Sequence, residues 1–529
     1  MPSSSISTNA TAPPKEEEGG EEAGGDVVIL DDLPARFTIG CDHVSVSTTT
    51  RPFRGVRGVP PGAHLVWVAP TDSTSSRSGF WFVTGGGPGA GARVQVHAKR
   101  WDAANEVLVG GDARGRPLGE VLPALAPYRF PVSGPRPGSS GRREQGEADL
   151  LPPFVRNKAS MWSYLTSAIT PQLLDSVMGD RDRSRRGVDG RQASSGESWP
   201  VTSSDRVLGE SRTPEEAKLY SSGIGSSGDP SDPSPPLRFM FRMDEQLFDT
   251  AAEGAERTRQ ALDPTGWILS MLDGSVSRHS SSSPPPDAVA GPAHGTGRAE
   301  DRDHHQSDHP PPAAGAEAGA GAGAADRLLG ELQLAFLTGA HLGNFSCLEQ
   351  WHFALARVAL RAHGLAARRP RLARDLLRAL HAQLAYADLF LDGGDVLEAL
   401  VSDQGHGQGR GRGRGRGHAK GGLRRALTTY RARLEEMKLG GGGGDGEGEG
   451  VGQVADAFAD LEAYLGRGRG WDLRADAYLR SGDLMLEDGE VVHVDLDEFA
   501  DEDERGEFAP VVVGLDELGR QTDLVSWDR

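Results

Sequence analysis

Four arginines alternate with glycine in the stretch "GQGRGRGRGRGHAKGG" (407–422), a pattern that could bind RNA. The arginines are Arg410, Arg412, Arg414 and Arg416. Guanidinium groups neutralise phosphate charge and stack on bases, but single-strand binding also uses aromatic stacking platforms. Residues 403–422 contain no aromatic side chain. We therefore interpret the stretch as a solvated insertion between two helices and keep RNA binding as the alternative.

Three other patterns could hold a ligand, and each lacks the context that its chemistry requires. "GIGSSG" (223–228) matches a dinucleotide fingerprint, but no predicted strand precedes it and no helix follows it. "GGGPGAGARV" (85–94) leads into a strand, whereas phosphate cradling needs a helix N-terminus. His304, His305 and His309 could hold a metal ion only weakly without a fold to orient them. The sequence thus predicts no enzyme, no cofactor and no metal site.

Composition restricts the classes of protein to consider. The 529 residues include 72 glycines and 34 prolines, so much of the length need not fold. The net charge of −19 opposes general affinity for nucleic acids, which are polyanions. Cys41 and Cys347 are distant in sequence, which favours a reducing compartment, and no apolar run approaches the ~18 residues of a membrane span. The polar, acidic N-terminus indicates neither a signal nor a transit peptide. We expect a protein of the cytoplasm and nucleus.

Stretches rich in glycine, serine, proline, alanine or charge divide the chain into blocks. Such stretches cannot bury enough apolar surface to offset the entropy lost on ordering. We expect disorder in residues 1–25, about 132–148, 180–236, 274–325, 403–422 and 440–452. The remainder is about two-thirds of the chain, enough for two domains.

The block 26–128 has the pattern of an all-β domain. Apolar runs occur in "DVVIL" (26–30), "PPGAHLVWVA" (60–69), "GFWFV" (79–83) and "ARVQVHAK" (92–99). Short strands separated by turns, without helical periods between them, are typical of a β-sandwich or a small barrel. We interpret the glycine cluster between the last two runs as a hairpin loop.

The C-terminal half changes to a helical period. Leu348, Trp351, Leu355 and Val358 follow at spacings of three, four and three, which defines one face of a helix. Asn344 precedes this stripe and is a candidate N-cap. Two further stripes are Leu372, Leu376, Leu380 and Leu384, and Leu427, Tyr430, Leu434 and Met437. The pattern predicts a helical bundle or a solenoid-like domain.

The C-terminal segment carries acidic and β-forming residues. In "LMLEDGEVVHVDLDEFADEDE" (484–504), Asp488-Gly489 predicts the turn of a hairpin. Seven of the ten residues in 495–504 are acidic. The following tail favours an extended strand, which would either join the chain's own β-domain as an edge or add to a sheet of a partner. The candidate partner-binding residues are Phe508, Ala509, Pro510, Val511, Val512 and Val513.

Three Ser/Thr-Pro sites lie in the tracts expected to be disordered. Thr213, Ser234 and Ser283 each precede a proline. A phosphate would add about −1.5 to −2 charges near pH 7. We hypothesise that phosphorylation there releases a partner, against the alternative that these are unused surface residues.

Several blocks, taken in order, resemble the Aar-two (A-one cistron) splicing factor family. They are "DVVILDDLPARFTIG" (26–40), "FRGVRGVPPGAHLVWV" (53–68), "GFWFV" (79–83), "LLGELQLAFLTGAHLGNFSCLEQWHFAL" (328–355) and "APVVVGLDE" (509–517), with weaker matches at 161–178, 237–241 and 256–264. The long insertions depart from the family pattern, including residues 484–504.

The resemblance implies an α+β multidomain protein, with an N-terminal β-sandwich-like domain, a C-terminal all-α helical domain and long disordered insertions. It also implies a non-enzymatic factor of U5 snRNP assembly. Such a factor binds the large spliceosomal scaffold protein (Prp-eight) at its RNase H-like and Jab/MPN-like domains and keeps the U5 helicase away until it leaves. In the relatives the C-terminal tail contacts the scaffold, which favours the partner-binding interpretation of Phe508 to Val513. The alternatives are a generic protein-interaction scaffold and an RNA-binding accessory protein that uses the RG segment.

The expected organisation follows the blocks along the chain. It comprises a disordered acidic N-terminus (1–25), the β-sandwich-like domain (26–128), a helical connector (151–179), a mostly disordered linker (180–325) with family-like segments at 237–272, the helical domain (326–480) with inserted loops at 403–422 and 440–452, and a C-terminal part (481–529) with the hairpin insertion and the tail strand.

Overall fold

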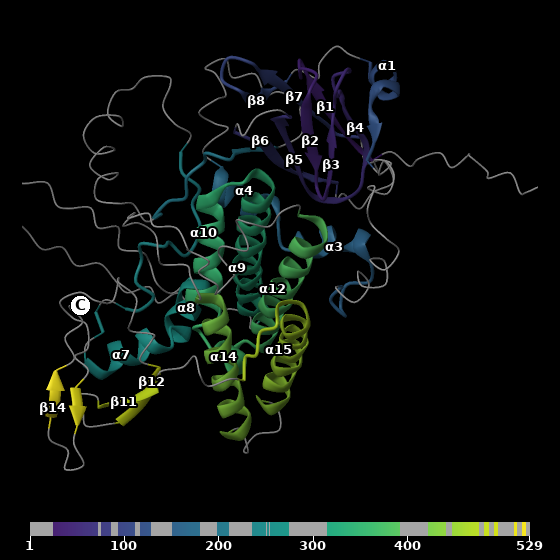
Figure 1. Cartoon of the computed structure of the whole chain (residues 1–529). Helices are drawn as coiled ribbons and strands as arrows, with labels where there is room; N and C mark the ends of the chain where they lie inside the picture. The colour runs from purple at the N-terminus through teal and green to yellow at the C-terminus, as the bar shows by residue number, and fades with distance from the viewer. Residues whose placement is uncertain are drawn as a thin grey trace, which may run out of the picture. The chain divides into compact units, whose positions relative to one another are not determined.

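The computed structural model of the chain contains two compact units (Figure 1). The β unit comprises Met1–Pro135 with Arg185–Pro200, and the helical unit comprises Arg136–Ser184 with Val201–Arg529. The structure describes residues 25–71, 76–85, 94–111, 117–128, 151–179, 198–210, 235–249, 251–252, 254–274, 315–391, 422–440, 447–474, 481–485, 491–495, 513–515 and 521–524.

The described residues of the first half form two five-stranded sheets. The strand orders are β8-β7-β1-β4-β9 and β10-β6-β5-β2-β3. The strands are β1 Asp26–Asp31, β2 Phe37–Cys41, β3 Val44–Ser47, β4 Gly55–Val59, β5 Gly62–Pro70, β6 Ser78–Thr84, β7 Val96–Asp102, β8 Val107–Gly110, β9 Ala126–Pro127 and β10 Trp199–Thr202.

The core of the β unit lies between these sheets. Alternate residues of β1, such as Val28 and Leu30, share one buried cluster with Val66 and Phe80 from the other sheet. The intervening β1 residues pack with Leu125 on the opposite face, beside the short helices α1 Leu118–Val121 and η1 Leu122–Ala124. Side chains of a strand alternate between its two faces, so this arrangement gives the sandwich a dry interior. The predicted β-sandwich is confirmed.

The predicted hairpin between the last two apolar runs is wrong. β6 pairs antiparallel with β5, whereas β7 pairs parallel with β1, starting at Val27 and Val96. The second edge of β6 is taken by β10. With both edges of β6 already paired, the glycine-rich connection 85–94 joins two different sheets.

The helical unit contains the helices expected around the three apolar stripes and in the connector, together with others that the sequence did not predict. They are α3 Lys158–Leu165, α4 Pro171–Met178, α7 Gly254–Leu262, α8 Thr265–Leu272, α9 Gly315–Leu342, α10 Phe345–Phe353, the π-helix η3 Ala354–Ala359, α11 Leu365–Arg368, α12 Pro370–Phe390, α14 Gly422–Gly440 and α15 Glu447–Arg469. All residues of the three predicted stripes are buried except Met437, which is half-buried. None of the described helices is both long and apolar enough to cross a membrane.

Part of the tract 180–236, which was expected to be disordered, is ordered. Residues 198–210 are described, and Trp199, Val201 and Val207 are buried. Helices α9 and α15 likewise begin inside tracts assigned to disorder, at Gly315 and Glu447. Isolated apolar residues in a polar tract can order when their packing partners lie elsewhere in the sequence.

The C-terminal strands form two small antiparallel sheets. β11 Ser481–Met485 pairs with β12 Val491–Asp495, so the predicted hairpin is confirmed, while its turn lies outside the described residues. β13 Val513–Leu515 pairs with β14 Gln521–Leu524.

Candidate partner-binding site

Asn344 holds an extended segment against the start of α10. Its Oδ1 accepts a hydrogen bond from the Cys347 amide at 2.8 Å, which confirms the predicted N-cap. Its Nδ2 donates to the carbonyl oxygens of Thr202 at 2.9 Å and Asp205 at 2.8 Å. The side chain is fully buried. One residue therefore caps a helix and fixes a chain segment about 140 positions away.

A second extended segment is held by buried side chains of α9 and α10. Glu331 accepts from the Met240 amide at 2.7 Å and also binds Arg327 at 3.0 Å. The Gln350 amide donates to the Phe241 carbonyl at 2.8 Å. Burying a polar group is costly unless it is hydrogen-bonded, so these contacts determine where the segment lies. The sequence analysis did not predict these roles of Glu331 and Gln350. A polar residue among the apolar positions of a helix could have indicated them.

The two extended segments are joined by a short parallel ladder. Val207 bridges Leu237; the Leu208 amide donates to the Leu237 carbonyl, and the Leu237 amide to the Arg206 carbonyl, both at 2.8 Å. We call residues 202–210 and 235–242 the anchored strap. Its two halves hold the ends of the stretch that contains Thr213 and Ser234. Those residues and Ser283 lie outside the described residues, so phosphorylation remains a hypothesis.

A buried histidine–aspartate pair lies at one end of the β unit. His64 Nδ1 lies 2.7 Å from Asp42 Oδ2, and Nε2 lies 2.8 Å from the Pro60 carbonyl oxygen. Asp42 also accepts hydrogen bonds from the Leu65 amide at 3.0 Å and from the Tyr128 hydroxyl. Both ring nitrogens are engaged and the His64 side chain is only 3% exposed. The pair ties turns of the sandwich together and has no open position for a substrate.

The charge state of this pair follows from its surroundings. Burial opposes a charge on His64, but the Asp42 carboxylate and its hydrogen bond outweigh burial and raise the pKa of the imidazole. His97, also buried, lies 3.7 Å from Asp26, and there burial dominates and lowers the pKa to about 4. The pKa values of the two histidines are therefore shifted in opposite directions from the ordinary value of the imidazole.

We expect the stabilisation provided by His64 to decrease as the pH rises. Because its folded-state pKa lies above the unfolded value of about 6.5, the imidazolium stabilises the fold fully below that value and loses its effect as pH passes the folded pKa. The gap in unfolding free energy between the natural protein and His64→Gln should narrow with rising pH in urea titrations. For His97, whose folded-state pKa is lowered, the unfolding free energy of the natural protein relative to His97→Gln should instead increase as the pH rises. A His64 gap that widened with pH would contradict the assignment.

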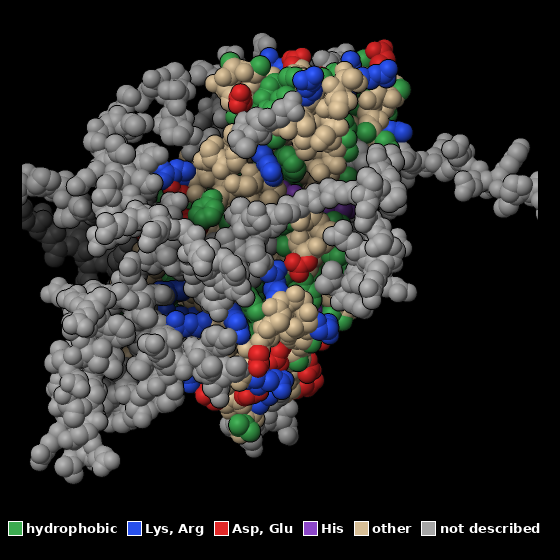
Figure 2. Space-filling view, in the orientation of Figure 1, with side chains coloured by type: hydrophobic (Ala, Val, Ile, Leu, Met, Phe, Trp, Pro, Cys, Tyr) green, Lys and Arg blue, Asp and Glu red, His purple; other side chains and the backbone are tan. Residues whose placement is uncertain are grey.

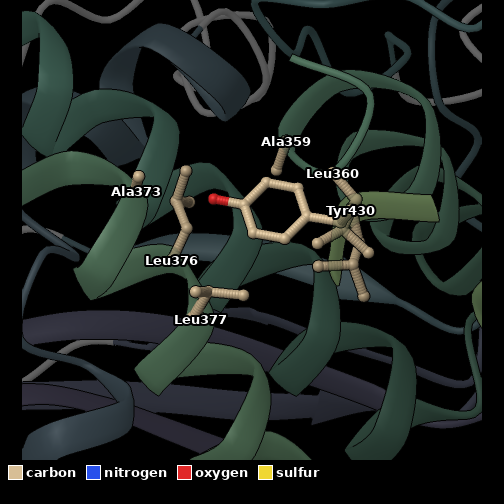
Figure 3. Close-up of a pocket in the computed structure, with 7 residues that line it drawn as sticks. Ala359, Leu360, Ala373, Leu376, Leu377 and Tyr430 are labelled. Carbon is tan, nitrogen blue, oxygen red and sulfur yellow. The ribbon is translucent and has the colours of Figure 1, made fainter. Parts of the chain in front are cut away.

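A small apolar cavity lies inside the helical unit (Figure 3). Its volume is about 10 Å³, which is close to the space that one water molecule requires. The ring of Tyr430 points into it between Leu360 and Leu376, and burial raises the pKa of the Tyr430 hydroxyl. This is a packing defect, too small for a ligand.

Most of the ligand patterns considered in the sequence analysis lie outside the described residues. No group of three or more His, Cys, Asp or Glu among the described residues could hold a metal ion. His304, His305, His309 and the stretch 223–228 lie outside the described residues, as does the RG stretch up to residue 421.

The predicted tail site is described only in part. Val513 begins β13, whereas Phe508, Ala509, Pro510, Val511 and Val512 lie outside the described residues. β13 pairs with β14 and joins neither five-stranded sheet. The pairing concerns only Val513 of the six candidate residues, so both interpretations of the tail stay predictions.

The fold is that of a two-unit protein in which the buried polar side chains described above hold extended segments against helices. Comparison with protein families identifies the family to which it belongs. Residues 24–179 match the AAR2 N-terminal domain, and residues 240–474 match the AAR2 C-terminal repeat region. The chain belongs to the AAR2 (Aar-two) family, and it is a splicing-related factor. A comparison with curated proteins found no match.

The matched ranges contain most of the described elements of both units. The N-terminal match contains β1 to β9 together with α3 and α4 but not β10, and the C-terminal match begins inside the anchored strap and ends after α15. Membership implies partners among the components of the U5 snRNP.

Proposed function

We propose that the protein is a non-enzymatic U5 snRNP assembly factor that binds the large spliceosomal scaffold protein (Prp-eight). In this proposal it contacts the RNase H-like and Jab/MPN-like domains of the scaffold and keeps the U5 helicase off until release. The observation that carries the proposal is the match of both family regions, in order, over both folded units. The factor would act in the cytoplasm and the nucleus.

The tail supplies the main contact in this proposal. A chain segment that adds to an open sheet edge gains main-chain hydrogen bonds, and its alternate side chains fill pockets. The residues assigned to this contact are Phe508, Ala509, Pro510, Val511, Val512 and Val513. Val513, the last residue of this segment, lies in the strand β13, which pairs with β14.

Affinity purification of the tagged full chain from nuclear and cytosolic extracts tests the proposal. The scaffold protein should co-purify in amounts close to those of the bait, and the U5 helicase should be depleted from the same complex. Recovery of the helicase with the scaffold would overturn the blocking role. Absence of the scaffold from both extracts would overturn the proposed function.

The RG stretch is expected to be dispensable for scaffold binding. Replacing residues 405–421 with a short Gly/Ser loop should leave the melting temperature and the scaffold affinity unchanged, because loops between helices tolerate large changes in length. α14 begins at Gly422, directly after the replaced residues, so the replacement leaves the buried residues of α14 unchanged. Lost binding at physiological salt, with folding retained, would favour the RNA-binding alternative.

A further inference from the structure

Three arginines and two aromatic rings meet on one side of α12. Arg371, Arg374 and Arg378 follow at spacings of three and four, which places them on one face of that helix. Phe154, which precedes α3, packs against this face. Its ring centroid lies 5.5 Å from the guanidinium carbon of Arg378 and 5.0 Å from the ring centroid of Tyr164. Both rings are half-buried, so each keeps part of its surface accessible.

Helix α15 supplies a fourth arginine at the other side of α12. The Arg374 guanidinium donates to Gln453 Oε1 of α15 at 3.1 Å, so the stripe borders that helix. Farther along, burial lowers the pKa of the His381 imidazole to about 4, with a smaller contribution from the nearby, exposed Arg467. The His381 ring lies 5.6 Å from that of Phe154. We call Phe154, Tyr164, Arg371, Arg374, Arg378 and Arg467 the arginine–aromatic face.

The positive charge of this face is only partly compensated. Arg374 Nε lies 3.0 Å from Asp375 Oδ1. Arg371, Arg378 and Arg467 form no ion pair with another described residue. The lower ends of α14 and α15 differ, because acidic and basic side chains lie next to one another there (Figure 2). The arginine–aromatic face is therefore a local positive surface on a chain whose net charge is −19.

Arginines interleaved with aromatic rings are suited to single-stranded nucleic acid. Guanidinium groups neutralise phosphates, and unpaired bases stack on aromatic rings or on guanidinium planes. The ring of Phe154 restrains the guanidinium of Arg378, so part of the ordering that a stacked base requires is already made. From Arg371 to Arg378 the stripe covers about 10 Å of helix, which limits the ligand to a short segment.

We propose that the arginine–aromatic face binds a short single strand of nucleic acid. The two rings favour this ligand over an acidic peptide, which would engage the arginines but offers no bases to stack. The face is distinct from the RG stretch, which contains no aromatic side chain. Because the whole chain is acidic, binding should weaken steeply as salt is added. This activity is additional to the proposed contact with the scaffold protein.

Fluorescence anisotropy with labelled oligouridine and oligothymidine tests the proposal. The protein is the full chain in which a short Gly/Ser loop replaces residues 405–421, because this replacement removes the arginines of the RG stretch. On a single strand each neutralised phosphate contributes about −0.7 to the slope of log K against log salt, so four arginines predict a slope of about −3. Binding of either probe supports the proposal, and the tighter probe identifies the ligand as RNA or DNA.

Two substitutions separate the charge of the face from its stacking. Replacing Arg371, Arg374 and Arg378 with glutamine should reduce the magnitude of the slope by about 2. Phe154→Leu should weaken binding about tenfold and leave the slope unchanged, because a lost base stack removes no phosphate contact. A purely structural role of the ring would lower the melting temperature without separating affinity from slope. Tyr164→Leu repeats the stacking test if Phe154→Leu unfolds.

The matched control changes the net charge by the same amount elsewhere. It combines Arg51→Gln, Arg54→Gln and Arg100→Gln, three exposed positions of the β unit. Since these arginines lie outside the arginine–aromatic face, the control should keep both the affinity and the slope.

Three outcomes would overturn the proposal. In the first, neither oligonucleotide binds at low salt once the RG stretch is replaced. In the second, binding persists unchanged after the three arginine substitutions on α12. In the third, a decaglutamate peptide binds with the same slope, and Phe154→Leu affects neither ligand. The face would then accept an acidic segment of a protein instead of a nucleic acid.

Discussion

Cutting the chain after Arg505 is expected to weaken binding to the scaffold protein by about 100-fold or more, since each lost main-chain hydrogen bond contributes about 0.5–1.5 kcal/mol. The melting temperature should change little. The cut removes Phe508 to Val513 together with β13 and β14, and neither strand pairs with a five-stranded sheet. Calorimetry of binding and thermal unfolding of the same preparation would measure both quantities.

A second cut separates the tail segment from its hairpin. Ending the chain after Gly519 removes β14 but keeps Phe508 to Val513. Because the remaining strand can still pair with the scaffold, this variant should bind almost as well as the full chain. If the cut after Arg505 unfolds the β unit while each folded molecule still binds, the tail belongs to the core and the proposed contact is wrong.

Replacing Asn344 with alanine is expected to destabilise the helical unit by about 3 kcal/mol. Loss of an N-cap costs about 1 kcal/mol, and a buried carbonyl left without a donor costs about 1–3 kcal/mol. The two carbonyls concerned belong to Thr202 and Asp205. Urea unfolding would measure the change, and proteolysis should show that the anchored strap loosens first.

Asn344→Ser divides this effect into its two parts. Serine keeps an oxygen for the Cys347 amide but offers no amide group to Thr202 and Asp205. The serine variant should therefore recover only the capping part, about 1 kcal/mol, relative to alanine. A serine variant as stable as the natural protein would show that the two carbonyls find other partners, and the role of Asn344 in holding the strap would be rejected.

Local patterns within the sequence predicted four strands of the β unit, β1, β5, β6 and β7, and three helix faces. The three leucine-rich stripes lie on buried helix faces because a helix brings residues three and four positions apart to one side. Asn344 was identifiable as a cap because its type and its place before an apolar stripe are both local properties. The pairing of β11 with β12 agrees with the hairpin expected from the turn residues Asp488-Gly489 between them, which lie outside the described residues. Family membership, too, could be read from blocks in order along the chain.

The amino-acid sequence thus determined the two kinds of unit, the helix faces and the family of this protein. Only the tertiary structure decided that β7 pairs with β1, that residues 198–210 are ordered, and that β13 pairs with β14. It also revealed that Glu331 and Gln350 hold Met240 and Phe241. These features depend on hydrogen bonds and burial between residues up to about 140 positions apart. Periodicity and capping act within a few residues, whereas the partner of a strand edge or of a buried polar group is set by the packing of the whole unit.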